Sequence, residues 1–361
     1  MVADRLIADT TARIFADLAE PRTVSAAYDD AWKVEVWRAL VDAGLPLLWV
    51  PEEAGGIGAS FVEGLAALEA AGAKACAVPL AETMAGAWLL ARAGLHVPTK
   101  RLALLLPGLR LDAAGRLWGD AAAAPFASSA ECLVGMVEDA DDVAHVVLVE
   151  RPSQMECSED LAGDERGSAR FDGTLPVVGA ALSREVGRRD LLLLSAAARA
   201  ALMAGALGAL VEMSVGYAQE RQAFGRTISK FQAVQHLLAR LAGEAAAASV
   251  ASQAAGWALD RAEGPLADAL LDVAAAKVRV GEAAGVGAAI AHQVHGAIGF
   301  TAEHVLHRFT HRLWSWRDDY GSETFWAEEL GRHVAAAGVD GFWGRLTGNP
   351  EPTSRSVGLE I

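Results

Sequence analysis

The feature that most constrains the fold is a set of three long Ala-rich apolar runs in the second half of the chain. Each run is far longer than a β-strand and Ala has the highest helix propensity, so each predicts a helix. Gly264-Pro265 separates the last two runs, because proline breaks a helix interior. Long helices joined by short connections pack antiparallel, which predicts a four-helix bundle. The predicted helices cover residues 191–220, 231–247 with room to continue to 263, and 267–294.

A polar corner at residues 217–236 interrupts these runs. The first helix is expected to end near Phe224, with Gly225 in the left-handed conformation that ends many helices. Thr227 or Ser229, both good N-cap residues, is expected to start the next helix. The corner would then present a guanidinium, an aromatic edge and free backbone N–H groups together, which suits a planar ligand that carries phosphate. The residues that are poor choices for a core are Arg221, Phe224, Gly225, Arg226 and Gln232.

The spacing in this corner, Y-x-x-x-R-x-x-F-G-x-x-I-x-x-F-Q-x-V-Q-H, resembles a signature of the acyl-CoA dehydrogenase family. Members of that family are flavoproteins that form an α,β double bond in a CoA thioester. The resemblance implies that Arg221, Phe224 and Gln232 contact the ADP part of FAD, and that this FAD belongs largely to the neighbouring subunit. The alternative is a helical hairpin with a basic corner and no ligand.

A second element, from Gln293 to Phe300, follows the last long run and resembles the family's Q-x-x-G-G-x-G-F sequence. Glycine lets the backbone approach a ligand closely. By the same resemblance, Gln293 and Gly296 reach FAD from across the subunit interface, while Ala297 stands in place of the second glycine. A Gly-rich helix end without a ligand is the alternative.

The remainder of the chain predicts two further parts and a tail. Residues 1–100 are expected to form an N-terminal helical domain, whose connector V-P-E-E-A-G-G-I-G also resembles the family. Residues 101–185 hold short apolar or alternating runs between turn-forming residues and predict a small antiparallel β domain. Residues 186–345 would form the C-terminal helical bundle and residues 346–361 a loose tail. This mainly α fold with a small β domain is also the acyl-CoA dehydrogenase-like fold that the resemblance implies.

One family segment has no clear counterpart in this sequence. A segment close to T-E-P-x-x-G-S-D holds the flavin ring and the acyl chain in the family. The nearest stretches here, residues 122–129 and 156–163, do not fit it. The sequence therefore does not show that this subunit builds its own site for the flavin ring.

Desaturation requires a carboxylate that removes the α-proton while hydride leaves the β-carbon for the flavin. The resemblance places this base at Tyr320 in the commoner family pattern and at Ser195 in the alternative pattern, and neither residue is a carboxylate. A phenol with a pKa near 10 is ionised in only about one molecule in a thousand at neutral pH. Asp318, Asp319 and Glu323 are near in sequence and could swing in. Asp319 and Glu323 are four residues apart, so on a helix they would share a face. The alternative for both is an ordinary solvated acid.

Composition argues against several other classes of function. The net charge of −15 disfavours a nucleic-acid partner. Three widely spaced cysteines and the lack of a carboxylate–histidine set indicate a reducing compartment such as the cytoplasm and no metal site. Residues 191–211 are long enough to span a membrane and contain one charge, Arg199. Their Ala and Gly content favours close packing inside a soluble bundle instead.

Three functions fit these observations. In the first, the chain is one subunit of a hetero-oligomeric acyl-CoA dehydrogenase and a partner subunit supplies the catalytic Glu. Two-gene enzymes of this kind act in the family on bulky steroid side-chain CoA thioesters. In the second, a homo-oligomer works alone with Asp319 or Glu323 as an unusual base. In the third, the chain is a flavin-free structural member of the fold. For the enzymes, the resemblance implies an acyl-CoA substrate and an electron-transferring flavoprotein as electron acceptor.

Overall fold

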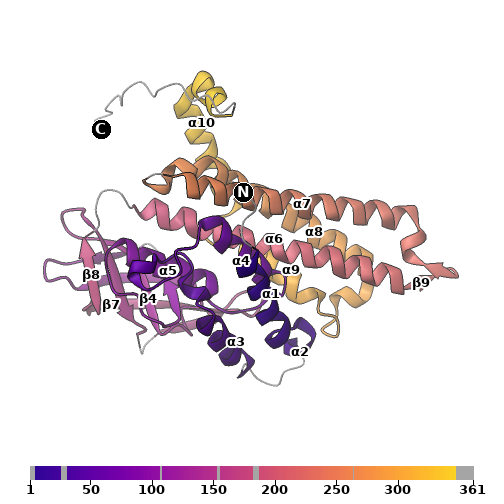
Figure 1. Ribbon diagram of the computed structural model, residues 1–361, viewed down its shortest axis with the longest axis horizontal. Helices are drawn as coiled ribbons and strands as arrows, with labels where there is room; N and C mark the ends of the chain where they lie inside the picture. Colours follow the sequence, from indigo (N-terminus) through magenta and orange to yellow (C-terminus); the bar gives the residue numbers. More distant parts are fainter. Residues whose placement is uncertain are drawn as a thin grey trace.

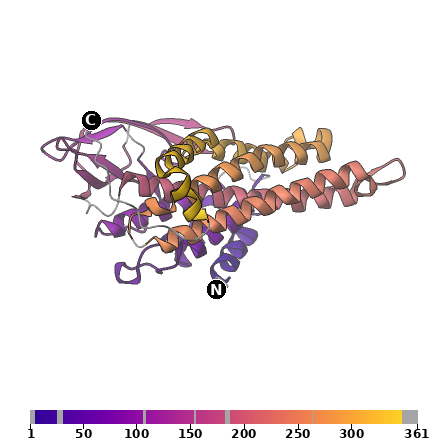
Figure 2. The same ribbon diagram turned by 90° about the horizontal axis from the view of Figure 1, so that it is seen from above.

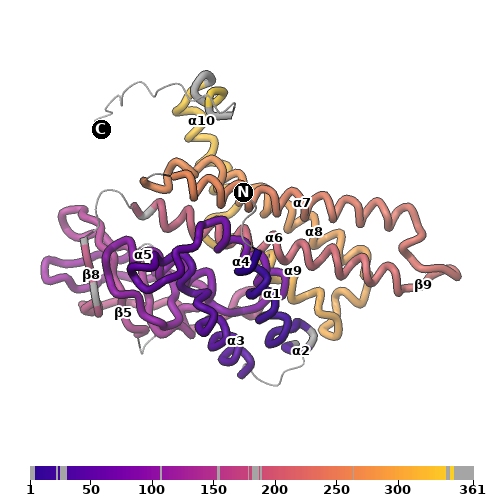
Figure 3. Tube along the Cα trace, viewed as in Figure 1, coloured from indigo at the N-terminus to yellow at the C-terminus, as the bar shows by residue number. Residues whose placement is uncertain are grey.

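The computed structural model describes residues 5–25, 31–105, 108–152, 155–181, 187–262 and 264–346. A group of N-terminal helices, a β-sheet and a long helical bundle follow one another along the chain, and Figure 1 and Figure 3 allow this path to be traced. The expected tail, apart from Leu346, lies outside the described residues.

Five α-helices precede the sheet in the residues that the structure describes. The fourth begins with a capping box, in which the hydroxyl of Ser60 accepts from the backbone N–H of Glu63 and the Glu63 carboxylate accepts from the backbone N–H of Ser60. The fifth is buried from Leu80 to Leu90 and packs on the sheet, where Gly86 approaches Val134 and Leu102. The helices are α1 (Leu6–Leu18), α2 (Pro21–Ser25), α3 (Ala31–Asp42), α4 (Phe61–Gly72) and α5 (Leu80–Arg92).

The sheet is mixed, so the prediction of a purely antiparallel sheet was wrong. Both β1 and β2 pair parallel with β4. The reason is that the chain leaving β3 passes to the far side of β2 instead of turning back beside β3. The strand order is β6-β7-β3-β2-β4-β5-β8, with β1 also beside β4. The strands are β1 (Leu102–Leu104), β2 (Leu109–Leu111), β3 (Leu117–Pro125), β4 (Cys132–Glu138), β5 (Ala144–Glu150), β6 (Glu156–Glu159), β7 (Glu165–Thr174) and β8 (Val178–Ala181).

Alternate residues of the strands face two apolar cores. Leu102 and Leu104 belong to the large core that the sheet shares with the helices. Ala103 and Leu105 point the other way, into a smaller core made by the sheet itself. The sheet thus uses one face to hold the helices, which places α5 and the bundle on the same side of it.

The bundle is built on three long helices that lie alongside one another, as Figure 2 shows from above. Their bounds agree with the prediction to within a few residues. The first of them is long and apolar enough to cross a membrane, but its apolar window is 89% buried inside the protein. The helices are α6 (Arg188–Glu220), α7 (Gln232–Arg261), α8 (Leu270–His295), α9 (Leu306–Asp318) and α10 (Glu323–Leu346).

The corner between α6 and α7 is a β-hairpin, whereas the sequence predicted a direct turn from helix to helix. Strand β9 (Gln222–Ala223) pairs with β10 (Arg226–Thr227). Phe224 and Gly225 form the turn with φ of 52° and 76°, and positive φ at both positions is what a two-residue hairpin of this kind requires. Gly225 is therefore left-handed as predicted, but it turns a hairpin and does not cap a helix.

The predicted N-caps of the next helix were also wrong. The hydroxyls of Thr227 and Ser229 hydrogen-bond to each other at 2.9 Å, so neither is used to cap α7. The N-cap position is occupied by Phe231. A short 3-10 turn, Ile228–Lys230, separates the hairpin from α7.

Candidate active site and cofactor surface

The two positions at which the family resemblance places a catalytic base meet around Arg199. Ser195 lies one turn before Arg199 on the same face of α6. Tyr320 follows α9, and its ring centroid lies 5.4 Å from the guanidinium carbon of Arg199. Residues far apart in the sequence therefore converge on one place.

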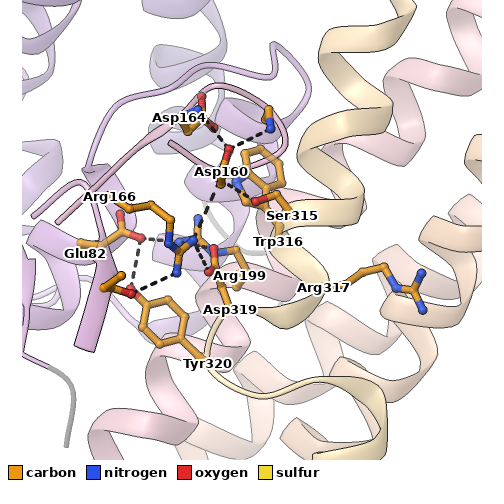
Figure 4. A network of polar contacts seen from close by, with 12 residues as sticks. Glu82, Asp160, Asp164, Arg166, Arg199, Ser315, Trp316, Arg317, Asp319 and Tyr320 are labelled. Carbon is orange, nitrogen blue, oxygen red and sulfur yellow. Dashed lines mark hydrogen bonds and ion pairs between the residues drawn. The ribbon is translucent and has the colours of Figure 1, made fainter. Parts of the chain in front are cut away.

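Arg199 is the centre of a buried ion-pair network (Figure 4). Its Nη2 lies 2.5 Å from Oε1 of Glu82 and 3.2 Å from Oδ2 of Asp319. Arg166 of β7 reaches the same Asp319 carboxylate at 2.9 Å. Glu82, Arg199 and Asp319 are only 1%, 2% and 5% exposed. Arg166 also lies 4.0 Å from the carboxylate of Asp160, so the network extends beyond these residues.

Burial governs the protonation of these groups. It raises the pKa of Glu82, with Arg199 opposing the rise. Burial alone would lower the pKa of Arg199, but Glu82 and Asp319 outweigh it and leave that pKa above its usual value. Burial, then the charge of Glu82, raise the pKa of Tyr320 well above 10. The Tyr320 hydroxyl donates to Glu82 Oε1 at 3.2 Å. The phenol is therefore neutral, so it is not a base at neutral pH.

The other candidate bases are engaged as well. The Ser195 hydroxyl is buried and donates to the carbonyl of Leu191 at 2.7 Å. Nε of Arg317 donates to the Glu323 carboxylate at 2.5 Å. Asp319 and Glu323 do not share a helix face, contrary to the prediction, because α9 ends at Asp318 and α10 begins at Glu323. Neither is an ordinary solvated acid, since each is held by arginine.

The turn between α9 and α10 sets the direction of Asp319 and Tyr320. Tyr320 has a φ of 56°, in the left-handed region, and Gly321 a φ of 101°. Lys277 of α8 supports the turn, since its Nζ donates to the carbonyls of Arg317 and Gly321, both at 2.7 Å. The position that carries the base in the commoner family pattern is thus held in place by a buried ammonium.

Sequence reasoning missed Glu82, Arg166 and Arg199 as parts of this site. Arg199 carried a usable signal, because it is the one charge in the apolar run of residues 191–211 and a buried charge needs a partner. Glu82 carried the same signal in the apolar α5. Arg166 carried none, because charged residues are common on a strand whose alternate residues are exposed.

A cleft of about 400 Å³ opens beside the network, and Arg166, Asp319 and Tyr320 line part of it. Pro125, Asp160 and Leu161 contribute to the remaining wall. These three belong to residues 122–129 and 156–163, the two stretches that failed to match the family's flavin-ring segment. The fold brings both stretches to the site although neither has the expected sequence.

The residues that the resemblance assigns to FAD binding lie at the end of the bundle far from the sheet (Figure 1). The hairpin end carries three of them and the end of α8 carries two. Tyr217 of α6 stacks on His295 of α8 with ring centroids 4.5 Å apart, which holds the two elements side by side. All five are exposed, namely Arg221, Phe224, Gln232, Gln293 and Gly296.

This surface has the chemistry that an adenosine diphosphate group needs. Arg221 offers an exposed guanidinium for phosphate, and the ring of Phe224 is 95% exposed. Gly296 has a φ of 64° and nothing within 4 Å of the place where a Cβ would be, so its backbone is open to a ligand. In the part of the chain that the structure describes, no group of three or more His, Cys, Asp or Glu side chains is placed to hold a metal ion.

Comparison with known proteins gives the family. The sequence profile described as acyl-CoA dehydrogenase, N-terminal domain, matches residues 3–101, and the one described as acyl-CoA dehydrogenase, C-terminal domain, matches residues 189–316. Acyl-CoA dehydrogenase FadE27 of Mycobacterium tuberculosis is 31% identical over 337 residues, which cover 83% of this chain and 88% of that protein. Acyl-CoA dehydrogenase IpdE2 of the same organism is 28% identical and covers 85% of this chain and 90% of that protein.

Solved structures agree with the fold. The ChsE4-ChsE5 complex from Mycobacterium tuberculosis superposes with a TM-score of 0.82 at 23% identity, covering 94% of this chain and 99% of that chain. The Tcur3481-Tcur3483 steroid ACAD G363A variant superposes with a TM-score of 0.80 at 25% identity, covering 92% of this chain and 97% of that chain. PigA, solved with FAD and proline, has the same fold at a TM-score of 0.78. The chain therefore belongs to the acyl-CoA dehydrogenase family of FAD-dependent oxidoreductases.

Proposed function

We propose that the chain is one subunit of a hetero-oligomeric acyl-CoA dehydrogenase, and that it gives the ADP half of the FAD site to a partner subunit that holds the catalytic Glu. One observation carries this proposal. The side chains at both base positions, and the two carboxylates that were expected to share a helix face, are all engaged inside the chain (Ser195, Asp319, Tyr320 and Glu323). A general base must be free to reach the proton that it removes.

The far end of the bundle supports the other half of the proposal. There, residues suited to a diphosphate and an adenine are exposed and unused by the chain's own core, with Phe224 at 95% exposure. Ile298 and Phe300, just after α8, are exposed as well, and a group of exposed apolar side chains is typical of a surface that is covered in an assembly. When bound, FAD supplies the hydride acceptor, and this chain would bind and orient its ADP part through Arg221, Phe224, Gln232, Gln293 and Gly296.

The similar proteins suggest the setting. Two of the similar solved structures are the ChsE4-ChsE5 complex and the Tcur3481-Tcur3483 steroid ACAD G363A variant. We accordingly take a steroid-derived CoA thioester as the first substrate to test, in the cytoplasm, with an electron-transferring flavoprotein as the acceptor. The two alternatives are less well supported. A self-sufficient enzyme would need Asp319 or Glu323 released from arginine, and a flavin-free protein would leave the exposed residues at the hairpin unexplained.

The test is to express the chain alone and together with an acyl-CoA dehydrogenase-like protein encoded beside it. We expect the chain alone to be colourless and inactive, and the complex to hold FAD and to be bleached by an acyl-CoA. Arg221→Met should lower the FAD content of the complex, while Arg240→Met, an equally exposed arginine on α7, should leave it unchanged. A yellow, active chain without any partner would refute the proposal.

A further inference from the structure

The ion-pair network joins four separate parts of the chain at one point. Glu82 comes from α5, Arg166 from β7, Arg199 from α6, and Asp319 from the turn after α9. Tyr320 adds its hydroxyl to Glu82 at 3.2 Å. In Figure 4 these five side chains point toward one another, with Arg199 between the others. The N-terminal helices, the sheet and the bundle therefore share a single buried contact that needs no ligand.

The ion-pair network lies beside both base positions. An acyl group in this chain's own site would therefore have its reacting carbons next to the network. The place is filled, because Ser195, Arg199 and Glu82 are all at most 3% exposed. The 400 Å³ cleft runs up to Arg166, Asp319 and Tyr320 and is lined by them. Charged groups in this position would also have to lose their partners before an acyl chain could enter.

We propose that Glu82, Arg166, Arg199, Asp319 and Tyr320 form a lock that takes the place of an acyl group: it closes this chain's own copy of the acyl site from within and holds α5, β7 and the α9–α10 turn on the bundle without substrate. The lock rests on the proposed function, because only a subunit whose partner does the chemistry can give up its own site. Acyl-CoA would then bind only at the site in which the partner holds the base.

The energetics of buried ion pairs predict how the lock responds to substitution. Removing one member of a buried ion pair leaves the other charge uncompensated, whereas replacing both members by apolar residues of similar size is often neutral. Loss of Arg199 would leave Glu82 without a cationic partner among the described residues, while Asp319 would keep Arg166 at 2.9 Å. The damage should therefore be concentrated at α5 and at the turn, and not at the hairpin.

The experiment is hydrogen exchange measured by mass spectrometry on the co-expressed complex. Arg199→Met should speed exchange in α5 and in residues 318–321 by roughly 100-fold. The matched control is Arg189→Met, which removes an arginine of the same helix from an exposed ion pair with Glu329 at 2.8 Å. It should leave those segments unchanged. The double variant Glu82→Leu with Arg199→Met should restore most of the protection, and Glu82→Gln provides the same readout if Arg199→Met does not fold.

The outcomes separate the lock from the proposed function. FAD content should stay at the wild-type level in Arg199→Met, because Arg221 and the other residues proposed to bind FAD lie at the other end of the bundle. A loss of FAD only in Arg221→Met would support the function whatever becomes of the lock. Unchanged exchange in α5 after Arg199→Met, or exchange raised equally throughout the chain, would overturn the lock. So would slower exchange of residues 318–321 in the wild-type complex when octanoyl-CoA is added.

Discussion

The ammonium of Lys277 in α8 donates a 2.7 Å hydrogen bond to the backbone carbonyl of Gly321, which lies in the turn between α9 and α10. The same Nζ reaches the carbonyl of Arg317 at 2.7 Å, so one side chain caps the end of α9 and fixes the turn that follows. Tyr320 keeps its left-handed backbone inside that turn. The geometry of the network around Arg199 therefore depends on a lysine that hydrogen-bonds to the backbone of the turn.

This lysine makes the stability of the chain depend on pH in the alkaline range. Burial lowers the pKa of Lys277 to about 8, whereas the unfolded chain keeps the ordinary value. Between the two values the unfolded state holds a proton that the native state has lost, so stability rises with pH. The full gain is about 3 kcal/mol for a shift of this size.

The measurement is urea unfolding of the wild type and of Lys277→Met at pH 7.5, 9 and 10. The advantage of the wild type over the variant should grow with pH across this range. Lys74→Met, which removes a lysine from a partly exposed pair with Glu20 at 2.8 Å, is the control and should show no such growth. A constant difference between wild type and Lys277→Met would mean that the ammonium keeps an ordinary pKa when folded.

The crossing of α4 and α6 gives a prediction about stability alone. A Cβ added at Gly205 would lie 1.8 Å from the carbonyl oxygen of Glu69, so the two helices would have to separate. Gly205→Ala should therefore lower the free energy of unfolding by about 1–3 kcal/mol. Gly208→Ala, on the same helix with nothing within 4 Å, should raise it by up to about 1 kcal/mol, because Ala is the better helix former. Urea titrations of the two variants make the comparison, and equal effects would contradict the close approach.

The long helices were predictable because their signal is local. Ala-rich runs and the Gly264-Pro265 break give α6, α7 and α8 within a few residues. The direction of β4 was not predictable, because it depends on which neighbour a strand finds across the sheet. The hairpin at Phe224 was missed because an aromatic residue rarely takes a positive φ. Gly225 was the residue in the sequence that indicated a turn.

In the candidate site, too, the features with a local signal were predictable and the long-range contacts were not. Local motifs pointed to Arg221 and Gln293, and the missing base at Tyr320 followed from counting along the sequence. The residues that fill the place of the base could not be predicted in this way, because the pairing of Glu82 with Arg199 joins segments that approach only in the folded chain. The available hint was that Arg199 and Glu82 each lie among apolar residues in their helices, and the two could have been interpreted as partners.

Tyr320→Phe tests the conclusion that the phenol is not a base. The change removes one hydrogen bond to Glu82 and leaves the ion pair with Arg199 intact. We expect a loss of stability of about 1–2 kcal/mol. Turnover of the co-expressed complex should change by less than about twofold, whereas removal of a true general base costs about 10²–10⁴-fold. Steady-state rates of the purified complex decide between these outcomes.

Phe224 is expected to link the hairpin to assembly, because in the isolated chain its ring has an edge contact with Phe231, at 6.2 Å between ring centroids, and is otherwise open to solvent. Its ring is 95% exposed and its φ is 52°, a conformation that asparagine adopts more readily. Phe224→Asn should therefore leave the isolated chain as stable as the wild type, or slightly more stable.

If the ring of Phe224 packs on the adenine of a partner-held FAD, the same change should weaken FAD binding by the complex about tenfold, which is about 1.4 kcal/mol. Val250→Gln, which removes an exposed apolar side chain from α7, controls for a general loss of apolar surface. Titration of the apo complex with FAD gives the affinities, and an unchanged affinity in Phe224→Asn would place the ring outside the cofactor site.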